Sequence, residues 1–373
     1  MDISEIFMSR CLELAGHGRG NVAPNPMVGA VIVSDGIIIG EGYHHCFGEA
    51  HAEVNAIASV RDEAQLRRST LYVNLEPCSC YGKTPPCAEL IIRKKIPRVV
   101  VACQDPNPEV AGRGIKMLQE TGIEVITGVM EREAGYLNRY FMTAHRHRRP
   151  YIILKWAQSE DGFIDYKRKD ASEKPAIFST PLTRMMVHQL RSEVQAIMVG
   201  TTTAVMDNPL LTVRYWSGKS PIRILIDRNL CVPATYHLFD GARQTLIFTR
   251  QNALSTEEMN FSKKEFVNYV NKAYVNYVKI DNPAFQLSDM ATILYQKNIY
   301  SLLVEGGARL HRSFMEENLC DELIIETAPV QLHEGVKSPH YSGVQLIERQ
   351  IIGSESITDK GISMIERFSF KTI

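Results

Sequence analysis

Four side chains in the first quarter of the chain have the types and the order of a catalytic zinc site. His51 and Glu53 lie two positions apart, and Cys78 and Cys87 follow downstream, Cys78 directly after a proline. Two thiolates and one imidazole can hold Zn²⁺ and leave a fourth position for water, as catalytic zinc requires. The metal lowers the pKa of that water toward ~7, and a carboxylate such as Glu53 can carry its proton to a departing amine. This order of residues predicts hydrolytic removal of an amino group from a nucleobase-like ring.

The spacing of the two cysteines departs from the usual deaminase pattern, in which two residues lie between them. Here eight residues separate Cys78 from Cys87, and Cys80 competes as a ligand. We favour Cys87 because it opens a predicted helix, whose N-terminal dipole stabilises a thiolate, whereas Cys80 lies in a glycine-containing loop. A closed structural zinc site, or cysteines that are merely buried, is the competing interpretation. Glu53 argues for catalysis, because a purely structural site does not need it.

The predicted elements around these residues bring the three ligands toward one point. His51 and Cys87 each open a predicted helix, and Cys78 follows the end of a predicted strand. Strands alternate with helices throughout this half, which implies α/β layers around a largely parallel sheet, and an Asp35-Gly36 turn predicts a hairpin. Predicted helices cover 3–15, 51–60, 87–95 and 114–120, and predicted strands cover 28–33, 37–40, 70–75, 99–102 and 124–126.

A second α/β unit with a different pattern follows the first. Residues 143–150 are polar and basic and end in a proline, so we interpret them as a solvated linker between domains of residues 1–146 and 147–373. A length of 373 residues suits two domains of ~100–200 residues each. In this unit, predicted strands cover 151–154, 196–199, 222–226, 245–248 and 301–304, and predicted helices cover 181–192 and 308–318.

Charge and composition argue against several classes of protein. The chain has 42 Lys+Arg against 42 Asp+Glu, whereas nucleic-acid binding depends largely on cations that neutralise phosphates. No apolar stretch approaches the ~20 residues that span a bilayer, and the acidic N-terminus does not resemble a signal peptide. The eight cysteines include the group at 78, 80 and 87, which favours metal or catalysis over a disulfide framework. We expect a cytoplasmic, homo-oligomeric enzyme with small-molecule substrates and no nucleic-acid or membrane partner.

A pair of glycines in the second half could accommodate a dinucleotide. Gly306-Gly307 lies between a predicted strand and a predicted helix, where exposed backbone amides and the helix dipole attract a diphosphate. A plain loop is the competing interpretation, because Gly-Gly pairs are common in loops. No Gly-x-Gly-x-x-Gly follows a strand anywhere, which excludes a Rossmann site.

Several motifs of the first half carry a resemblance to a known family. They are Asn25-Pro26-Met27-Val28-Gly29-Ala30, Gly42-Tyr43-His44, His51-Ala52-Glu53, Glu76-Pro77-Cys78-Ser79-Cys80-Tyr81-Gly82-Lys83-Thr84-Pro85-Pro86-Cys87 and Asp105-Pro106-Asn107-Pro108. This half resembles the deaminase half of the bifunctional riboflavin-biosynthesis deaminase-reductases, in which a long insert between the cysteines is typical. The resemblance implies a cytidine-deaminase-like three-layer α/β sandwich that binds one Zn²⁺ per chain and deaminates a diaminopyrimidinone ribotide. The implied substrate contacts are Asn25, His44, Lys83, Asp105 and Asn107, and Cys80 stands where many members have histidine.

The second half is similar to the reductase half of the same family. Its motifs are Leu154-Lys155-Trp156-Ala157-Gln158-Ser159-Glu160-Asp161-Gly162, Val187-His188-Gln189-Leu190-Arg191, Gly200-Thr201-Thr202-Thr203, Asp207-Asn208-Pro209-Leu210-Leu211-Thr212-Val213-Arg214 and Glu305-Gly306-Gly307. The resemblance implies a dihydrofolate-reductase-like domain that uses NADPH to reduce the ribosyl group of the pyrimidine ribotide to ribityl. The implied cofactor contacts are Ala157, Ile177, Thr203, Asp207, Arg228, Gly306 and Gly307, and the implied substrate contacts are Lys155, Arg191, Leu211, Arg214 and Glu305.

Two places depart from the family pattern. Many members have Ser-x-Trp-Ile followed by Thr or Ser, but this chain has Pro175-Ala176-Ile177-Phe178-Ser179, so Ile177 replaces the tryptophan. Arg228 replaces a small hydroxyl residue, and we hypothesise that it binds the 2′-phosphate of NADPH.

The leading interpretation is a bifunctional enzyme in which a zinc deaminase precedes an NADPH-dependent reductase. In one alternative only the deaminase is active, because the changes at Pro175 and Ile177 fall in the reductase. Another is a nucleic-acid-editing deaminase with an accessory domain, which the neutral charge and the long insert oppose. A metal-binding scaffold without catalysis is the third, and Glu53 opposes it.

Overall fold

The computed structural model describes residues 2–81, 85–108, 110–250, 274–280, 285–352 and 363–370. The chain divides between Arg149 and Pro150 into two compact units. This boundary lies within the predicted linker of residues 143–150, although helix α6 (Arg139–His147) occupies most of that segment. In the part of the chain that the structure describes, no helix is long and apolar enough to cross a membrane.

The first unit contains a mixed five-stranded sheet in the order β2-β1-β3-β4-β5. Strand β1 pairs antiparallel with both β2 and β3, while β3, β4 and β5 are parallel, so the largely parallel sheet that the sequence predicts is correct for only one side. The predicted hairpin is confirmed, with positive φ at Asp35 (54°) and Gly36 (76°). The bounds are Gly29–Ser34 (β1), Ile37–Tyr43 (β2), Thr70–Leu75 (β3), Arg98–Cys103 (β4) and Glu124–Thr127 (β5).

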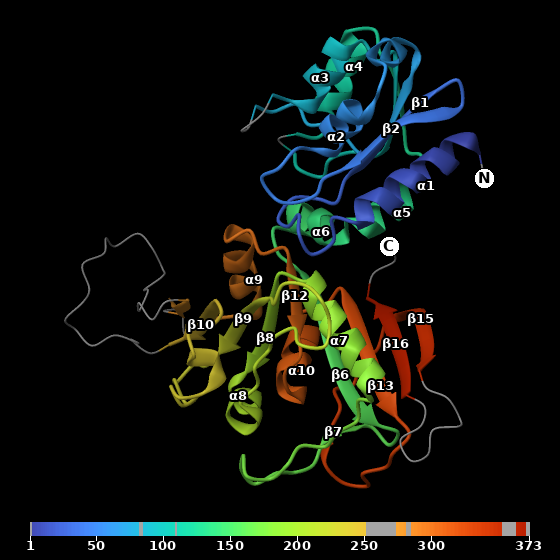
Figure 1. Cartoon of the computed structure of the whole chain (residues 1–373). Coiled ribbons are helices and arrows are strands. Elements are labelled where there is room, and N and C mark those ends of the chain that lie inside the picture. The colour runs from blue at the N-terminus through green and yellow to red at the C-terminus, as the bar shows by residue number, and fades with distance from the viewer. Residues whose placement is uncertain are drawn as a thin grey trace, which may run out of the picture. The chain divides into compact units, whose positions relative to one another are not determined.

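Helices cover both faces of this sheet and make the predicted three-layer sandwich (Figure 1). On one face, α2, α3 and α4 pack residues such as Ile57, Ile91 and Leu118 against β1, β3 and β4. On the other face, α1, α5 and α6 contribute residues such as Met8 and Met142. The helices are Ile3–Gly16 (α1), Ala52–Ser59 (α2), Cys87–Lys94 (α3), Arg113–Glu120 (α4) and Glu131–Leu137 (α5), with a 3₁₀ turn at Glu63–Arg68.

The second unit is built on a nine-stranded sheet in the order β11-β10-β9-β8-β12-β6-β13-β16-β15. All pairs from β11 to β13 are parallel, and β16 and β15 add an antiparallel edge. The bounds are Tyr151–Ser159 (β6), Ala196–Gly200 (β8), Ile222–Ile226 (β9), Thr245–Thr249 (β10), Val275–Lys279 (β11), Ser301–Val304 (β12), Glu322–Ala328 (β13), Gln345–Ile352 (β15) and Ser363–Ser369 (β16). Strands β7 (Phe163–Asp165) and β14 (Val336–Lys337) form a separate pair.

The helices of this unit follow the carboxyl ends of the parallel strands. Helix α8 (Thr201–Asp207) begins directly after β8, and three residues separate the end of β12 at Val304 from the start of α10 (Ala308–Glu316). The core packs Met290, Leu294 and Phe314 against the sheet. The other helices are α7 (Pro181–Glu193) and α9 (Leu287–Gln296), with a 3₁₀ turn at His237–Phe239. Loops at one edge of the sheet are therefore available for a binding site.

Candidate active sites

The three predicted zinc ligands come together in the first unit. His51 precedes α2, Cys78 follows β3, and Cys87 opens α3, and their donor atoms all lie within 4.8 Å of one another. The Sγ atoms of Cys78 and Cys87 lie 3.6 and 3.3 Å from His51 Nδ1. A tetrahedral ion about 2.0–2.3 Å from each donor needs separations of this size, so the cluster fits zinc and leaves a fourth position for water.

Cys80 is exposed and does not belong to this cluster. The geometry therefore favours Cys87 as the second thiolate ligand. The backbone N–H of Cys87, at the start of α3, donates to Cys78 Sγ over 3.3 Å. Hydrogen bonds from the Cys87 thiol and then from His51 hold the pKa of Cys78 well below its ordinary value. Both effects stabilise a thiolate, which is the form that binds zinc.

Glu53 lies in the first turn of α2, two residues after His51, and is only 3% exposed. Its burial, and next the negative charge of Cys78, raise the pKa of this carboxyl group to about 7. A carboxyl group with such a pKa can both accept and release a proton near neutral pH, which is what a general acid–base catalyst must do.

Two of the predicted substrate contacts lie beside the zinc cluster. The buried ring of His44 lies 5.6 Å from the ring of His51, centroid to centroid. Its Nδ1 lies 3.0 Å from the Ala50 carbonyl oxygen, and its Nε2 lies 3.1 Å from Asn25 Nδ2. Because burial lowers the pKa of His44, the neutral ring donates through Nδ1 and accepts from Asn25 through Nε2. Lys83, another predicted contact, lies outside the described residues.

Asp105 and Asn107 lie on the loop after β4, and a residue that the sequence analysis missed holds this loop. The carboxylate of Glu76 accepts four backbone N–H groups at 2.9–3.2 Å. Their donors are Asp105, Gly112, Gly114 and Ile115. Glu76 is 4% exposed and lies two residues before Cys78. The loop also approaches closely here, since a Cβ on Gly114 would lie 2.0 Å from the Pro77 carbonyl oxygen. Glu76 thus ties the substrate loop to the strand end that carries a zinc ligand.

The second unit contains a cavity of about 800 Å³. Nine of the twelve predicted reductase contacts line it: Lys155, Ala157, Ile177, Arg191, Thr203, Asp207, Arg214, Glu305 and Gly307. A second cavity of about 470 Å³ is lined by Gly306 and Arg228. Leu211 lines neither cavity and is 3% exposed, with a φ of 51°.

The two cavities share their lining where they meet. Thr202, Thr203, Gly307 and Arg309 line both, so the two cavities adjoin at the start of α10. A Cβ on Gly306 would lie 2.8 Å from the Val199 Cα, and Gly307 has a φ of 52°. Glycine is therefore required at both positions, as the dinucleotide interpretation supposes. Sequence analysis missed Arg309. Its position in the first turn of the helix after the two glycines could have indicated that it faces the same ligand.

A group of cations lines the larger cavity, and Arg191 is already paired within it. Its Nε and one terminal nitrogen donate to the Glu305 carboxylate at 2.9 and 2.5 Å, and the other donates to the Thr212 carbonyl oxygen. Burial acts to raise the pKa of Glu305, but Arg191 holds it below its usual range. Arg184, which the sequence analysis missed, and Arg214 both lie within 6 Å of the Tyr215 ring, at 5.9 and 5.8 Å. Among the described residues no carboxylate pairs with Arg184 or Arg214, so both leave positive charge on this side of the cavity, the basic wall.

Lys155 faces a buried carboxylate that sequence reasoning also missed. Its Nζ lies 3.7 Å from Glu326 Oε2, which accepts a hydrogen bond of 2.6 Å from the Ser179 hydroxyl. Glu326 is 1% exposed. Ser179 belongs to the stretch that departs from the family pattern, so this stretch still contacts the site.

Comparison with known proteins agrees with both sites. Residues 1–103 match the cytidine and deoxycytidylate deaminase zinc-binding region, and residues 150–359 match the RibD C-terminal domain. The chain is 40% identical to the riboflavin biosynthesis protein RibD of Bacillus amyloliquefaciens over 330 residues, which covers 88% of this chain and 85% of that protein. It is 37% identical to RibD of Escherichia coli over 339 residues, 87% of each chain.

Solved structures of similar chains cover both units. A diaminohydroxyphosphoribosylaminopyrimidine deaminase/5-amino-6-(5-phosphoribosylamino)uracil reductase from Thermotoga maritima has a TM-score of 0.82 at 32% identity, over 98% of each chain. RibD of Acinetobacter baumannii has a TM-score of 0.82 at 30% identity, again over 98% of each chain. The folds and sites define a zinc-binding deaminase joined to a dihydrofolate-reductase-like reductase. The chain belongs to the RibD family of bifunctional riboflavin-biosynthesis deaminase-reductases.

The zinc ligands can be tested one at a time by metal content. We expect Cys80→Ser to retain one zinc per chain, because Cys80 lies outside the cluster. Cys78→Ser and Cys87→Ser each remove one of three protein ligands and should lose most of the metal after dialysis against a weak chelator. Loss of zinc from Cys80→Ser, with full occupancy in Cys87→Ser, would reverse the assignment.

Glu76→Gln tests the carboxylate that holds the substrate loop. Each Glu76 oxygen accepts two N–H groups, so an amide nitrogen in either position faces two donors. Unsatisfied buried donors cost about 1–3 kcal/mol, so we expect kcat/KM for deamination to fall roughly tenfold to a hundredfold while zinc content is kept. The control is Glu120→Gln, at the exposed end of helix α4, which begins with the residues that Glu76 holds. Equal activity of the two variants would contradict the role of Glu76.

Proposed function

We propose that the chain deaminates a diaminopyrimidinone ribotide in its first unit and reduces the ribosyl group of the product to ribityl with NADPH in its second. The observation that carries this proposal is that each unit contains the groups its reaction needs. The first has two thiols and an imidazole within 4.8 Å of one another beside a buried carboxyl group, and the second has two joined cavities with a basic wall.

For deamination, His51, Cys78 and Cys87 would hold the zinc, which would supply a water of lowered pKa for the attack. Glu53 would carry one proton of that water to the ring nitrogen and the second to the amino group, whose bond to the ring carbon breaks as the carbonyl forms, so that ammonia leaves. The side-chain nitrogen of Asn25 donates to His44, so its amide oxygen would be the group that accepts a hydrogen bond from the pyrimidine ring.

For reduction, NADPH supplies the hydride, and the protein binds and orients both reactants. The larger cavity would hold the nicotinamide and the smaller one the adenosine, and Gly306 and Gly307 would face the diphosphate. This arrangement is supported by the four residues that the cavities share and by the close backbone approach at the two glycines. Ala157, Ile177, Thr203 and Asp207 complete the nicotinamide side.

The ribotide lies along the basic wall of the larger cavity. Arg184 and Arg214 bind its phosphate, while Arg191 orients Glu305 toward the sugar. Lys155, held by Glu326, contacts the opening ribose ring. Leu211 is almost fully buried and lines neither cavity, so we give its side chain no role in substrate binding.

The two reactions are separated by mass spectrometry of products from zinc-loaded protein given the diaminopyrimidinone ribotide. Ammonia should be released without NADPH, and the ribityl product should appear only with NADPH. Glu53→Gln should lower the deamination rate roughly 10²–10⁴-fold, yet still reduce the deaminated ribotide when this is supplied directly.

Each alternative outcome has a distinct meaning. Deamination without any reduction would restrict the activity to the first unit. Reduction without deamination by the wild-type protein would contradict the role of the zinc cluster. Absence of both reactions in zinc-loaded protein would overturn the proposed substrate.

Arg228 is proposed to bind the 2′-phosphate that distinguishes NADPH from NADH. It lines the smaller cavity together with Arg309. A charge-assisted hydrogen bond is worth about 1.5–3 kcal/mol, so we expect Arg228→Ala to reduce the preference for NADPH over NADH at least ~10-fold in kcat/KM. Arg312→Ala, on α10 but outside both cavities, is the control. If Arg228→Ala kept the wild-type preference for NADPH over NADH, Arg228 would not be the residue that binds the 2′-phosphate.

A further inference from the structure

One wall of the larger cavity is irregular backbone. Residues 166–180, between β7 and α7, form no helix or strand. Seven of them line the cavity: Tyr166, Lys167, Arg168, Ala176, Ile177, Phe178 and Ser179. This wall also contains the stretch in which the chain departs from the family pattern. Irregular backbone keeps a defined shape only where side chains or other backbone groups bond to it.

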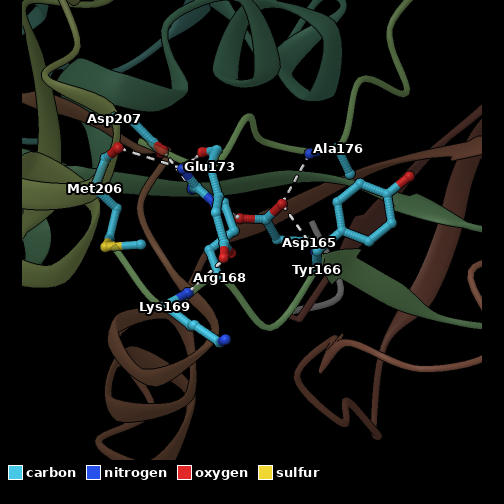
Figure 2. A network of polar contacts seen from close by, with 8 residues as sticks. All are labelled: Asp165, Tyr166, Arg168, Lys169, Glu173, Ala176, Met206 and Asp207. Carbon is cyan, nitrogen blue, oxygen red and sulfur yellow. Dashed lines mark hydrogen bonds and ion pairs between the residues drawn. The ribbon is translucent and has the colours of Figure 1, made fainter. Parts of the chain in front are cut away.

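Arg168 is the centre of the bonds that hold this wall (Figure 2). Its Nε donates to Asp165 Oδ2 at 2.7 Å, and a terminal nitrogen donates to Asp207 Oδ1. The other terminal nitrogen donates to the Met206 and Glu173 carbonyl oxygens at 3.3 and 3.4 Å. The Arg168 side chain is 6% exposed. One guanidinium group therefore joins the wall to both β7 and the end of α8.

Asp165 closes the loop on itself. Its Oδ1 accepts the backbone N–H of Tyr166 at 2.9 Å and that of Ala176 at 2.8 Å. The second bond brings Ala176 back beside β7 and so sets the position of Ile177, the next residue. At the far end, Ser179 is held by Glu326. Arg168 in turn orients the Asp165 carboxylate, because its Nε donates to Asp165 Oδ2 (Figure 2).

The network also sets the charge beside the cofactor. Asp165 and Asp207 are 20% and 32% exposed, and Arg168 is the cation between them. Asp207 lines the cavity in which we propose that an anionic dinucleotide binds. Without Arg168, two carboxylates would face each other and the incoming anion with no cation between them, and like charges at such distances repel.

We propose that Arg168 is a positioning residue for the nicotinamide cofactor: it fixes the wall that carries Ile177 and neutralises Asp207. This inference rests on the proposed reductase function. It assigns to Asp165, Arg168 and Asp207 the task of shaping the cofactor side of the cavity in this chain, whose wall lacks the aromatic residue of the family pattern.

The test is a double-mutant cycle in the full chain, with the Kd of NADPH measured by fluorescence titration and KM and kcat by steady-state kinetics. Arg168→Met should raise the Kd and the KM for NADPH roughly tenfold and change kcat less. Asp207→Asn should weaken binding in the wild-type background but improve it in the Arg168→Met background, because there it removes an unpaired negative charge. The Arg168→Met defect should also shrink at high salt, which screens that repulsion.

Two controls separate positioning from general damage. Arg349→Met removes an exposed arginine–carboxylate pair on strand β15, away from the cavity, and should leave NADPH binding unchanged. Deamination by each variant reports on the first unit of the same chain and should also be unchanged.

Unchanged NADPH affinity in Arg168→Met would overturn the inference. So would a double variant that binds worse than Arg168→Met at every salt concentration, because lost structure alone gives no such rescue. Failure of the wild-type protein to bind NADPH would instead overturn the proposed reductase function, on which the inference rests.

Discussion

Parallel strands bring their carboxyl ends to one edge of a sheet, and both active sites depend on this constraint. In the first unit, β3 and β4 are parallel, so Cys78 after β3 and the Asp105 loop after β4 reach the same edge. In the second unit, β9, β8 and β12 are parallel neighbours, and the residues after them line the joined cavities. Groups that are distant in the sequence therefore meet where loops can vary without disturbing the buried strands.

Elements with buried apolar residues could be predicted from the sequence. Strands β3, β9 and β12 have the predicted bounds, because their residues are almost all buried. Strand β15 could not be predicted, since most of its residues are exposed and no apolar alternation marks it. The basic residues of α6 suggested a linker, although Met142 and Ala144 on the same helix are buried. The antiparallel pairing of β1 with β3 depends on tertiary contacts that the local pattern does not contain.

The zinc ligands could be predicted because their chemistry admits few residue types, whereas the residues that hold the sites could not. Glu76 binds amides 29 to 39 positions away, and Arg168 reaches Asp207 across 39 positions. Any of many carboxylates or arginines could have made these bonds, so only the fold selects them. Leu211 illustrates the reverse case, in which a motif position proposed as a substrate contact turns out to be buried and outside both cavities.

The hydrogen bonds of Glu76 go to backbone N–H groups rather than to side chains. Most side chains of residues 105–108 and 110–115 can therefore change during evolution without breaking this attachment, with Gly114 excluded because a Cβ there would meet the Pro77 carbonyl oxygen. At the end of β3, by contrast, Glu76 and Cys78 act through their side chains and cannot be exchanged in this way. In this unit, new substrate preferences can arise by substitution in one loop while the hydrolytic machinery is inherited intact.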